Sequence, residues 1–191
     1  MAFSREGKMQ PRDFVLLAHG AFREGIAGRT ALQKIVYFSS VIMNTDLGYN
    51  PHFYGPYSPK VAEANSELKE LNYIKEIATT YGINGKGFEM TKYDYSLTED
   101  GLKLLERKKI QYGDDWKKIS EIAKSIQSAG KMNYMELAMA AKAHLILERE
   151  GGKTNRGTIK AKAKQLGWSI DDSGLDNALE FLSKIEVVTW N

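Results

Sequence analysis

Histidines and paired carboxylates are the side chains of this sequence that could first be considered for catalysis or metal binding. The histidines are His19, His52 and His144; each is isolated, and none belongs to an HExxH pair or has an acidic residue at a useful spacing. The pairs Asp114-Asp115 and Asp171-Asp172 are better explained as caps of helices or turns than as metal ligands. We therefore expect a protein that is not an enzyme and uses no metal ion or cofactor.

Phosphate-binding and thiol chemistry are also disfavoured by residue type and spacing. The segment 82–87 is rich in glycine, but it lacks the GxxxxGK[ST] pattern and leads into a predicted strand rather than into a helix. The chain has no cysteine, which excludes a disulfide framework, a cysteine nucleophile, a thiolate zinc site and an iron–sulfur centre.

Length, charge and hydropathy are those of a folded and mildly basic protein. The 191 residues include 42% hydrophobic residues, and 27 basic against 24 acidic residues give a formal charge of +3. This length allows one domain, or one compact domain with an appendage. No apolar run approaches the roughly 20 residues of a membrane span or the roughly 7–15 of a signal-peptide core. We expect a cytoplasmic protein that does not associate with membranes.

Three helices are predicted in the first part of the chain. Apolar residues recur at helical spacing over 11–25 and 28–46, and Ser58 is placed to cap a third helix over 59–72. The second of these helices has a wide apolar face and should be the most buried of the first half. We expect one core to be shared by Leu32, Ile35, Val36, Leu68, Leu71 and Leu97.

An antiparallel hairpin is predicted after the third helix. The segments 74–81 and 88–97 have the composition of strands and flank the glycine-rich loop. The alternation slips between Met90 and Tyr93, which indicates a bulge there. Thr98 is placed to cap a further helix.

This order of elements is that of a winged helix, with 59–72 as the recognition helix and 74–97 as the wing. The fold class is mainly α with a small antiparallel β-hairpin. We divide the chain into a winged-helix-like domain over 1–112 and a helical C-terminal region over 113–191 that packs on it. Helices of this second region are expected over 114–128, 133–150, 158–167 and 174–185.

Two motifs of the first domain resemble those of a known group of small prokaryotic domains. LQKIVYF at 32–38, followed by YGPYSP at 54–59, is similar to the pattern of YwgA-like and Panacea-type domains. YSLTEDG at 95–101 resembles the exit from the wing in many winged-helix regulators. The resemblance covers roughly residues 10–110 and implies a winged-helix-like core in a bacterial or archaeal protein. Panacea-type relatives include antitoxins and an adaptor that delivers a toxin to a protease.

The polar and aromatic residues of these motifs have two interpretations each. Gln33 and Lys34 stand in an apolar helix, where we interpret them as its solvent edge, with a direct functional role as the alternative. The prolines and glycine of YGPYSP favour a chain reversal with packed tyrosines. Alternatively, Tyr54 and Tyr57 form a protein-docking surface, to which Gln33 and Lys34 would also belong.

DNA binding would have to rely on more than the recognition helix. That helix carries two lysines and three glutamates, a charge of −1, whereas the segment 151–170 has five basic residues and no acid. The candidate DNA-binding residues are Lys60, Lys69, Lys75, Lys86, Lys92, Arg156, Lys160, Lys162 and Lys164.

Two functions follow from these observations. One is a winged-helix DNA-binding protein that acts as a transcriptional regulator on double-stranded DNA, which the wing lysines and the basic segment favour. The other is a protein-interaction module of the antitoxin or proteolytic-adaptor type, with a toxin or a protease component as its partner, which the acidic third helix favours. The sequence leaves open whether the protein forms a homodimer.

Overall fold

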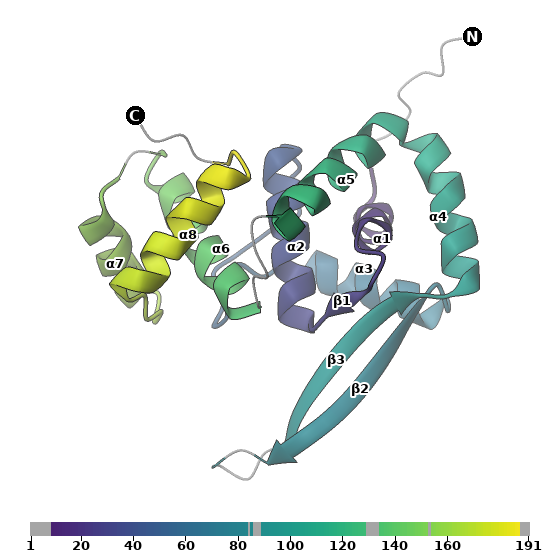
Figure 1. Cartoon of the computed structure of the whole chain (residues 1–191), viewed down its shortest axis with the longest axis horizontal. Coiled ribbons are helices and arrows are strands. Elements are labelled where there is room, and N and C mark those ends of the chain that lie inside the picture. Colours follow the sequence, from purple (N-terminus) through teal and green to yellow (C-terminus); the bar gives the residue numbers. More distant parts are fainter. Residues whose placement is uncertain (1–8, 84, 86–88, 129–133, 153, 188–191) are drawn as a thin grey trace.

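The computed structural model describes residues 9–83, 85, 89–128, 134–152 and 154–187 (Figure 1). This part of the chain forms eight helices and a three-stranded antiparallel sheet, so the predicted mainly helical fold with a small antiparallel sheet is confirmed. In chain order the elements are α1 (Pro11–Ala21), β1 (Ile26–Ala27), α2 (Arg29–Ile42), α3 (Pro59–Glu70), β2 (Ile74–Ile83), β3 (Glu89–Leu97), α4 (Glu99–Gln111), α5 (Gly113–Ser128), α6 (Tyr134–Arg149), α7 (Arg156–Gln165) and α8 (Asp172–Lys184).

Helix α2 lies at the centre of the molecule, and all of its residues from 31 to 40 are buried (Figure 1). Its residues Ile35 and Val36 pack into a core with α1, α3 and the sheet. Its residues Tyr37 and Phe38 belong to a second core with α5, α6, α7 and α8, where the Phe38 and Phe181 ring centroids are 5.4 Å apart. Because one helix contributes to both cores, the two halves of the chain are packed together.

Helix α2 ends at Ile42, so its predicted end near Asp46 is wrong. Asn44 has φ of 50°, in the left-handed region that a helix cannot continue through and that Asn tolerates better than most residues. The N–H of Thr45 then donates to the carbonyl oxygen of Ser40 at 2.8 Å. This bond closes the helix end.

Most of the predicted core residues are confirmed, but the prediction is wrong for one of them. Ile35, Val36 and Leu68 are buried with Leu32, and the half-buried Leu97 packs against them. Leu71 is instead 52% exposed. It follows the last residue of α3, where Asn72 adopts φ of 58° and turns the chain away from the helix axis, so the helical spacing that placed Leu71 on the core face no longer applies.

The sheet has the strand order β1-β3-β2. The hairpin pairs Ile74 with Leu97 and Glu76 with Tyr95, and β1 adds Ile26 opposite Tyr95 on the other edge of β3. Strand β1 was not predicted, because its two residues are too few to show an alternation.

The bulge predicted between Met90 and Tyr93 is wrong. The register shifts instead in β2, where three steps from Thr80 to Ile83 face two steps of β3. Residues 77–81 of β2 are exposed because the outer half of the hairpin extends beyond the helices (Figure 1). Without a buried face, the pattern of apolar residues does not report the register there.

The base of the hairpin is fixed to the start of α4. Thr98 caps this helix as predicted: its Oγ1 accepts from the N–H of Gly101 at 3.0 Å and donates to the carbonyl oxygen of Asn72 at 2.6 Å. A Cβ on Gly101 would overlap the carbonyl oxygen of Tyr73. Only glycine allows this approach, which explains the glycine of the YSLTEDG motif.

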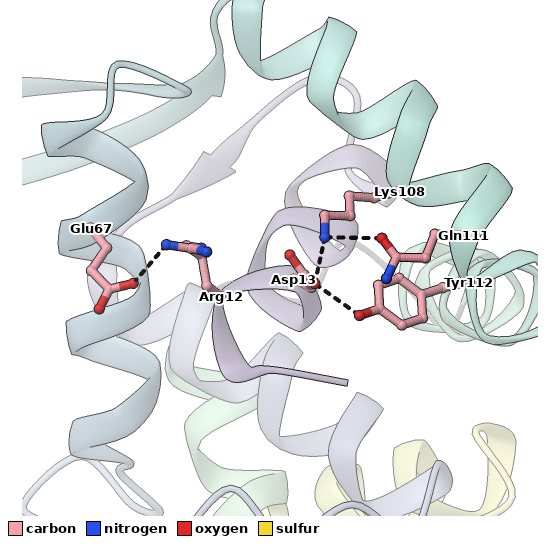
Figure 2. A network of polar contacts seen from close by, with 6 residues as sticks. All are labelled: Arg12, Asp13, Glu67, Lys108, Gln111 and Tyr112. Atoms are coloured by element: carbon pink, nitrogen blue, oxygen red, sulfur yellow. Dashed lines mark hydrogen bonds and ion pairs between the residues drawn. The ribbon is translucent and has the colours of Figure 1, made fainter. Parts of the chain in front are cut away.

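A buried carboxylate joins α4 to α1 (Figure 2). Asp13 accepts from Lys108 Nζ at 2.8 Å and from the Tyr112 hydroxyl at 2.9 Å, and Lys108 also donates to Gln111 at 3.1 Å. Burial and the Asp13 carboxylate raise the pKa of Tyr112 to about 12. These contacts attach α4 to the helical core.

The second half of the described chain consists of the four helices α5 to α8, each within a few residues of its predicted bounds. Four apolar residues of α6 belong to the same core as Tyr37 and Phe38 of α2: Leu137, Ala141, Leu145 and Ile146. Within the described ranges, no helix is long and apolar enough to cross a membrane.

Candidate functional site

The segment 50–58, which carries the YGPYSP motif, forms a closed loop that we call the aromatic loop. Asn50 and Tyr57 exchange two backbone hydrogen bonds of 3.0 and 2.9 Å, and His52 and Gly55 exchange two more of 3.2 and 2.9 Å. Gly55 has φ of 92°, which only glycine adopts readily, so this glycine is needed for the reversal. The predicted chain reversal is confirmed.

Gln33 and Lys34 hold this loop from within the protein. The Gln33 side chain donates to the carbonyl oxygen of Ser58 at 3.1 Å and accepts from the Ser58 N–H at 3.0 Å. Lys34 Nζ donates to the carbonyl oxygen of Pro56 at 2.5 Å. With exposures of 5% and 2%, these residues are not the solvent edge of α2, and that interpretation is wrong. Helix α2 is covered on all sides, so its polar side chains bind the backbone of the loop instead.

Ser58 connects the aromatic loop to helix α3. Its hydroxyl donates to the carbonyl oxygen of Leu47 at 2.5 Å and accepts from the N–H of Val61 at 3.2 Å, which confirms the predicted cap. On the other side of the loop, Trp168 Nε1 donates to the carbonyl oxygen of His52 at 2.8 Å. The loop backbone is thus bound by groups from α2, α3 and the linker between α7 and α8.

Two aromatic side chains project from this fixed backbone. Phe53 is 70% exposed and Tyr54 is 48% exposed, and their rings stand edge to face with centroids 4.9 Å apart. Tyr57, by contrast, is half-buried against the ring of His52. The sequence singled out Tyr54 and Tyr57, whereas the structure places Phe53 beside Tyr54 as the more exposed of the pair.

A groove of about 440 Å³ lies beside the aromatic loop, between α2, α3 and the base of the hairpin. Its walls include the rings of Tyr54 and Tyr57 and both predicted polar residues of α2. The residues that line it are Arg29, Thr30, Leu32, Gln33, Lys34, His52, Tyr54, Tyr57, Ala62, Asn65, Ser66, Lys69, Glu76 and Tyr95.

The carboxylate of Glu76 is bound by three side chains at one end of the groove. It lies 3.1 Å from Lys69 Nζ and 3.5 Å from Arg29 Nη2, and it accepts from the Tyr95 hydroxyl at 2.8 Å. Burial opposes the charge of Glu76, but the hydrogen bonds from Tyr95 and Lys69 and the charge of Arg29 together lower its pKa. The Arg29 guanidinium also lies over the Tyr93 ring, 3.7 Å from its centroid.

Lys34 differs from these groups because no carboxylate of the described chain forms an ion pair with it. Burial, together with the nearby charge of Lys142 on α6, lowers the pKa of Lys34 to about 7. A buried lysine amine whose partner is a neutral carbonyl oxygen is costly to protonate.

Asn65 connects the groove to a buried histidine behind it. Its Oδ1 lies 2.9 Å from His19 Nε2, and burial lowers the pKa of His19 to about 4. His144 is buried in the other core, 2.8 Å from the Tyr37 hydroxyl, and burial lowers its pKa to about 4 as well. These two histidines belong to the packed interior, and only His52 reaches the groove.

The predicted DNA-binding residues of the first domain are not equally available to contact a phosphate. Lys60 and Lys75 are exposed. Lys69 is paired with Glu76, and Lys92 lies 2.9 Å from Asp94. Lys86 lies outside the described residues.

The basic residues of the segment 151–170 meet acids from neighbouring elements. Arg156 pairs with Asp176, Lys160 lies 2.9 Å from Asp172, and Lys162 lies 3.1 Å from Glu150. Lys164 is exposed on the same helix, α7. This helix lies at one end of the molecule and the hairpin projects from the other half, so the structure does not bring the two sets of predicted DNA-binding residues together (Figure 1).

Sequence reasoning did not single out Arg29, Glu76, Tyr95 and Phe53 as functional residues, and these four complete the site. The predicted hairpin contained a usable signal, because strands that pair Ile74 with Leu97 also pair Glu76 with Tyr95. No such signal exists for Arg29, which comes from another element.

Comparison with known proteins finds one relative over most of the chain. A Bacillus subtilis (strain 168) protein with the name "Uncharacterized protein YwgA" is 28% identical over 164 residues, which cover 85% of this chain and 89% of that protein. No family model matches the chain. The similarity to this relative supports the YwgA-like family that the LQKIVYF and YGPYSP motifs indicate.

Proposed function

We propose that this protein is a winged-helix protein-interaction module that docks a partner protein through the aromatic loop. The order α1, α2, α3, β2, β3, α4 supports the winged-helix arrangement, with β2 and β3 as the wing. In the proposed module, the partner binds the aromatic loop next to α3 and not α3 itself, which is the usual recognition surface of a winged helix.

The exposed pair Phe53 and Tyr54 on a fixed backbone carries this proposal. Large aromatic side chains are the most frequent anchors of protein interfaces, and here their backbone is already held by Gln33, Lys34 and Trp168. A loop that is ordered before binding loses little conformational entropy when the partner arrives. The groove beside the loop is a concave surface into which side chains of the partner could pack.

The resemblance to Panacea-type domains narrows the class of partner. Some relatives of that type are antitoxins, and one is an adaptor that delivers a toxin to a protease. We therefore propose a toxin or a protease component as the partner of the aromatic loop.

The charges of the described residues favour a protein partner over DNA. The α3 helix exposes Glu63 and Glu70, which would repel phosphates. Three of the four basic residues singled out on α7 are already paired with carboxylates. Binding DNA through them would require those ion pairs to be broken.

A transcriptional regulator that binds double-stranded DNA is the second candidate. One observation favours it: the hairpin β2–β3 projects from the body as a wing does, and Lys75 is exposed on it (Figure 1). Lys60 at the start of α3 could contact a neighbouring phosphate.

The double variant Phe53→Ser/Tyr54→Ser tests the proposal against Tyr81→Ser, a control that removes an exposed aromatic ring from the wing. The tagged full chain is incubated with nuclease-treated lysate of the source cells, and bound proteins are quantified by mass spectrometry. We expect at least one protein to bind wild type and the control. The captured amount of this protein should be lower by about tenfold or more with the loop variant, since an anchor residue contributes about 2 kcal/mol or more to the binding free energy.

The same three proteins are then titrated with a labelled random 30-base-pair duplex at two salt concentrations. If wild type binds the duplex in a salt-dependent manner and no captured protein responds to the loop variant, the regulator is the correct function and the docking proposal is wrong.

A further inference from the structure

The groove beside the aromatic loop has more positive than negative charge. Arg29, Lys34 and Lys69 line it, and Glu76 is the one carboxylate among its described lining residues. Glu76 is engaged by Arg29 and Lys69 at the hairpin end, so its charge is already balanced there. Lys34 is the lining cation that forms no ion pair with a carboxylate of the described residues.

Lys34 has donors left for a ligand. A lysine ammonium carries three N–H donors, and the structure shows one of them in use, on the carbonyl oxygen of Pro56. Lys34 is one of the residues that line the groove and is 2% exposed, so its ammonium lies in a water-poor environment. Charge-assisted hydrogen bonds are strongest under such conditions.

We infer that the groove receives an acidic side chain of the partner's docking segment, a glutamate or aspartate flanked by apolar residues, with Lys34 as its counter-ion. This inference rests on the proposed function and specifies what the partner places beside Phe53 and Tyr54. The carboxylate supplies the negative charge that the groove lacks next to Lys34.

The shape and lining of the groove favour a peptide side chain over a free inorganic anion. Leu32, Ala62, Tyr54 and Tyr57 line the groove together with Lys34 and contribute apolar surface to it. A volume of about 440 Å³ exceeds what one small anion fills, and it matches the lower range of pockets that hold organic ligands. Apolar residues on either side of the acidic residue would cover this surface.

The charge state of Lys34 supports the same assignment. Burial and Lys142 hold its pKa at about 7, so Lys34 itself is only partly protonated at neutral pH when the groove is empty. The other charged or titratable side chains that line the groove are Arg29, His52, Tyr54, Tyr57, Lys69, Glu76 and Tyr95. Among these only Glu76 brings a negative charge at neutral pH, and its carboxylate is already bound by Arg29, Lys69 and Tyr95. A carboxylate at Lys34 would favour the ammonium form.

Two blocked peptides that differ in one charge test the inference: acetyl-Phe-Glu-Phe-amide and acetyl-Phe-Gln-Phe-amide. Each is titrated into the full chain at pH 6.5, and ¹H–¹⁵N spectra report the affinity and the residues that respond. We expect the glutamate peptide to bind about tenfold tighter or more, with shifts at α2 and the aromatic loop, because a hydrogen bond between charged groups is worth at least that factor.

Variants separate the charge of Lys34 from its role in holding the loop. Lys34→Gln retains a donor for the Pro56 carbonyl oxygen but removes the charge, and it should abolish the preference for the glutamate peptide. Lys69→Gln, at the exposed rim, provides a well-folded second variant and should reduce the preference a few-fold. Lys164→Gln, on α7 away from the groove, should leave it unchanged.

Equal affinity for the two peptides, or an unchanged preference in Lys34→Gln, would overturn the inference. So would inorganic phosphate that binds the same residues as tightly as the glutamate peptide, since the groove would then be a site for small anions. The proposed function would survive either result if the Phe53→Ser/Tyr54→Ser variant still lost its captured partner.

Discussion

The two buried histidines make the stability of this protein depend on pH within a narrow window. Burial lowers the pKa of His19 and of His144 from the ordinary value of 6.5 to about 4. Between these values the unfolded chain binds a proton on each residue and the folded chain does not. Stability contributed by the neutral histidines is therefore fully present above about pH 6.5 and is lost as the pH falls towards 4.

The size of the effect follows from the two pKa values. From pH 7 to pH 5, an unfolded-state pKa of 6.5 and a folded-state pKa of about 4 correspond to a loss of about 2 kcal/mol per histidine. The two together give about 4 kcal/mol, a large part of the 5–15 kcal/mol that typically stabilises a domain. The window ends at about pH 5 because the carboxylates of the unfolded chain begin to titrate below it.

Urea unfolding at pH 7, 6, 5.5 and 5, followed by circular dichroism, measures this slope. His19→Gln/His144→Gln is the matched control, since glutamine can hydrogen-bond to Asn65 and Tyr37 but does not titrate. The slope rather than the absolute stability is compared, because the double variant is itself destabilised. A wild type whose stability is flat between pH 7 and pH 5, or a variant with the same slope as wild type, would refute the reasoning.

Four further substitutions test the packing of the protein by urea unfolding. Leu68→Ala should cost about 2–5 kcal/mol because the side chain is fully buried, whereas Leu71→Ala should cost less than about 1 kcal/mol; equal costs would contradict the described end of α3. Asp13→Asn should cost about 1–3 kcal/mol, since Lys108 loses its charged partner, and no loss would show that the pair contributes nothing. Gln33→Ala should cost about 1–3 kcal/mol by leaving the buried N–H of Ser58 unpaired, since the Ser58 carbonyl oxygen still accepts from the N–H of Ala62, and an unchanged stability would mean that Gln33 does not hold the loop.

The sequence was sufficient to predict the elements that have a regular pattern. Helix α3 was predicted from Ser58 and Pro59, and α4 from Thr98, because these caps satisfy backbone N–H groups that a helix start leaves free. The end of α2 was missed because it depends on the left-handed conformation of Asn44, which asparagine permits but does not require. Local sequence determines whether such an end is allowed, and packing determines whether it occurs.

The candidate site was only partly predictable for a different reason. The motifs identified Gln33, Lys34 and Tyr54, but their roles depend on what covers α2. An isolated amphipathic helix would expose Gln33 and Lys34, whereas here the second half of the chain and the aromatic loop bury them. The net charge of the segment 151–170 was misleading in the same way, because the acidic residues that pair with its basic residues lie before and after the segment in the chain.

The central claim is that the aromatic loop contacts a protein partner. Site-specific photocrosslinking tests it most directly: p-benzoylphenylalanine replaces Tyr54 in one version of the full chain and the more exposed Tyr81 of the wing in another, and both are irradiated in the source cells. The account predicts a discrete protein adduct from position 54 and none of the same mass from position 81. An adduct from position 81 alone, or crosslinking to nucleic acid with no protein adduct at position 54, would contradict it.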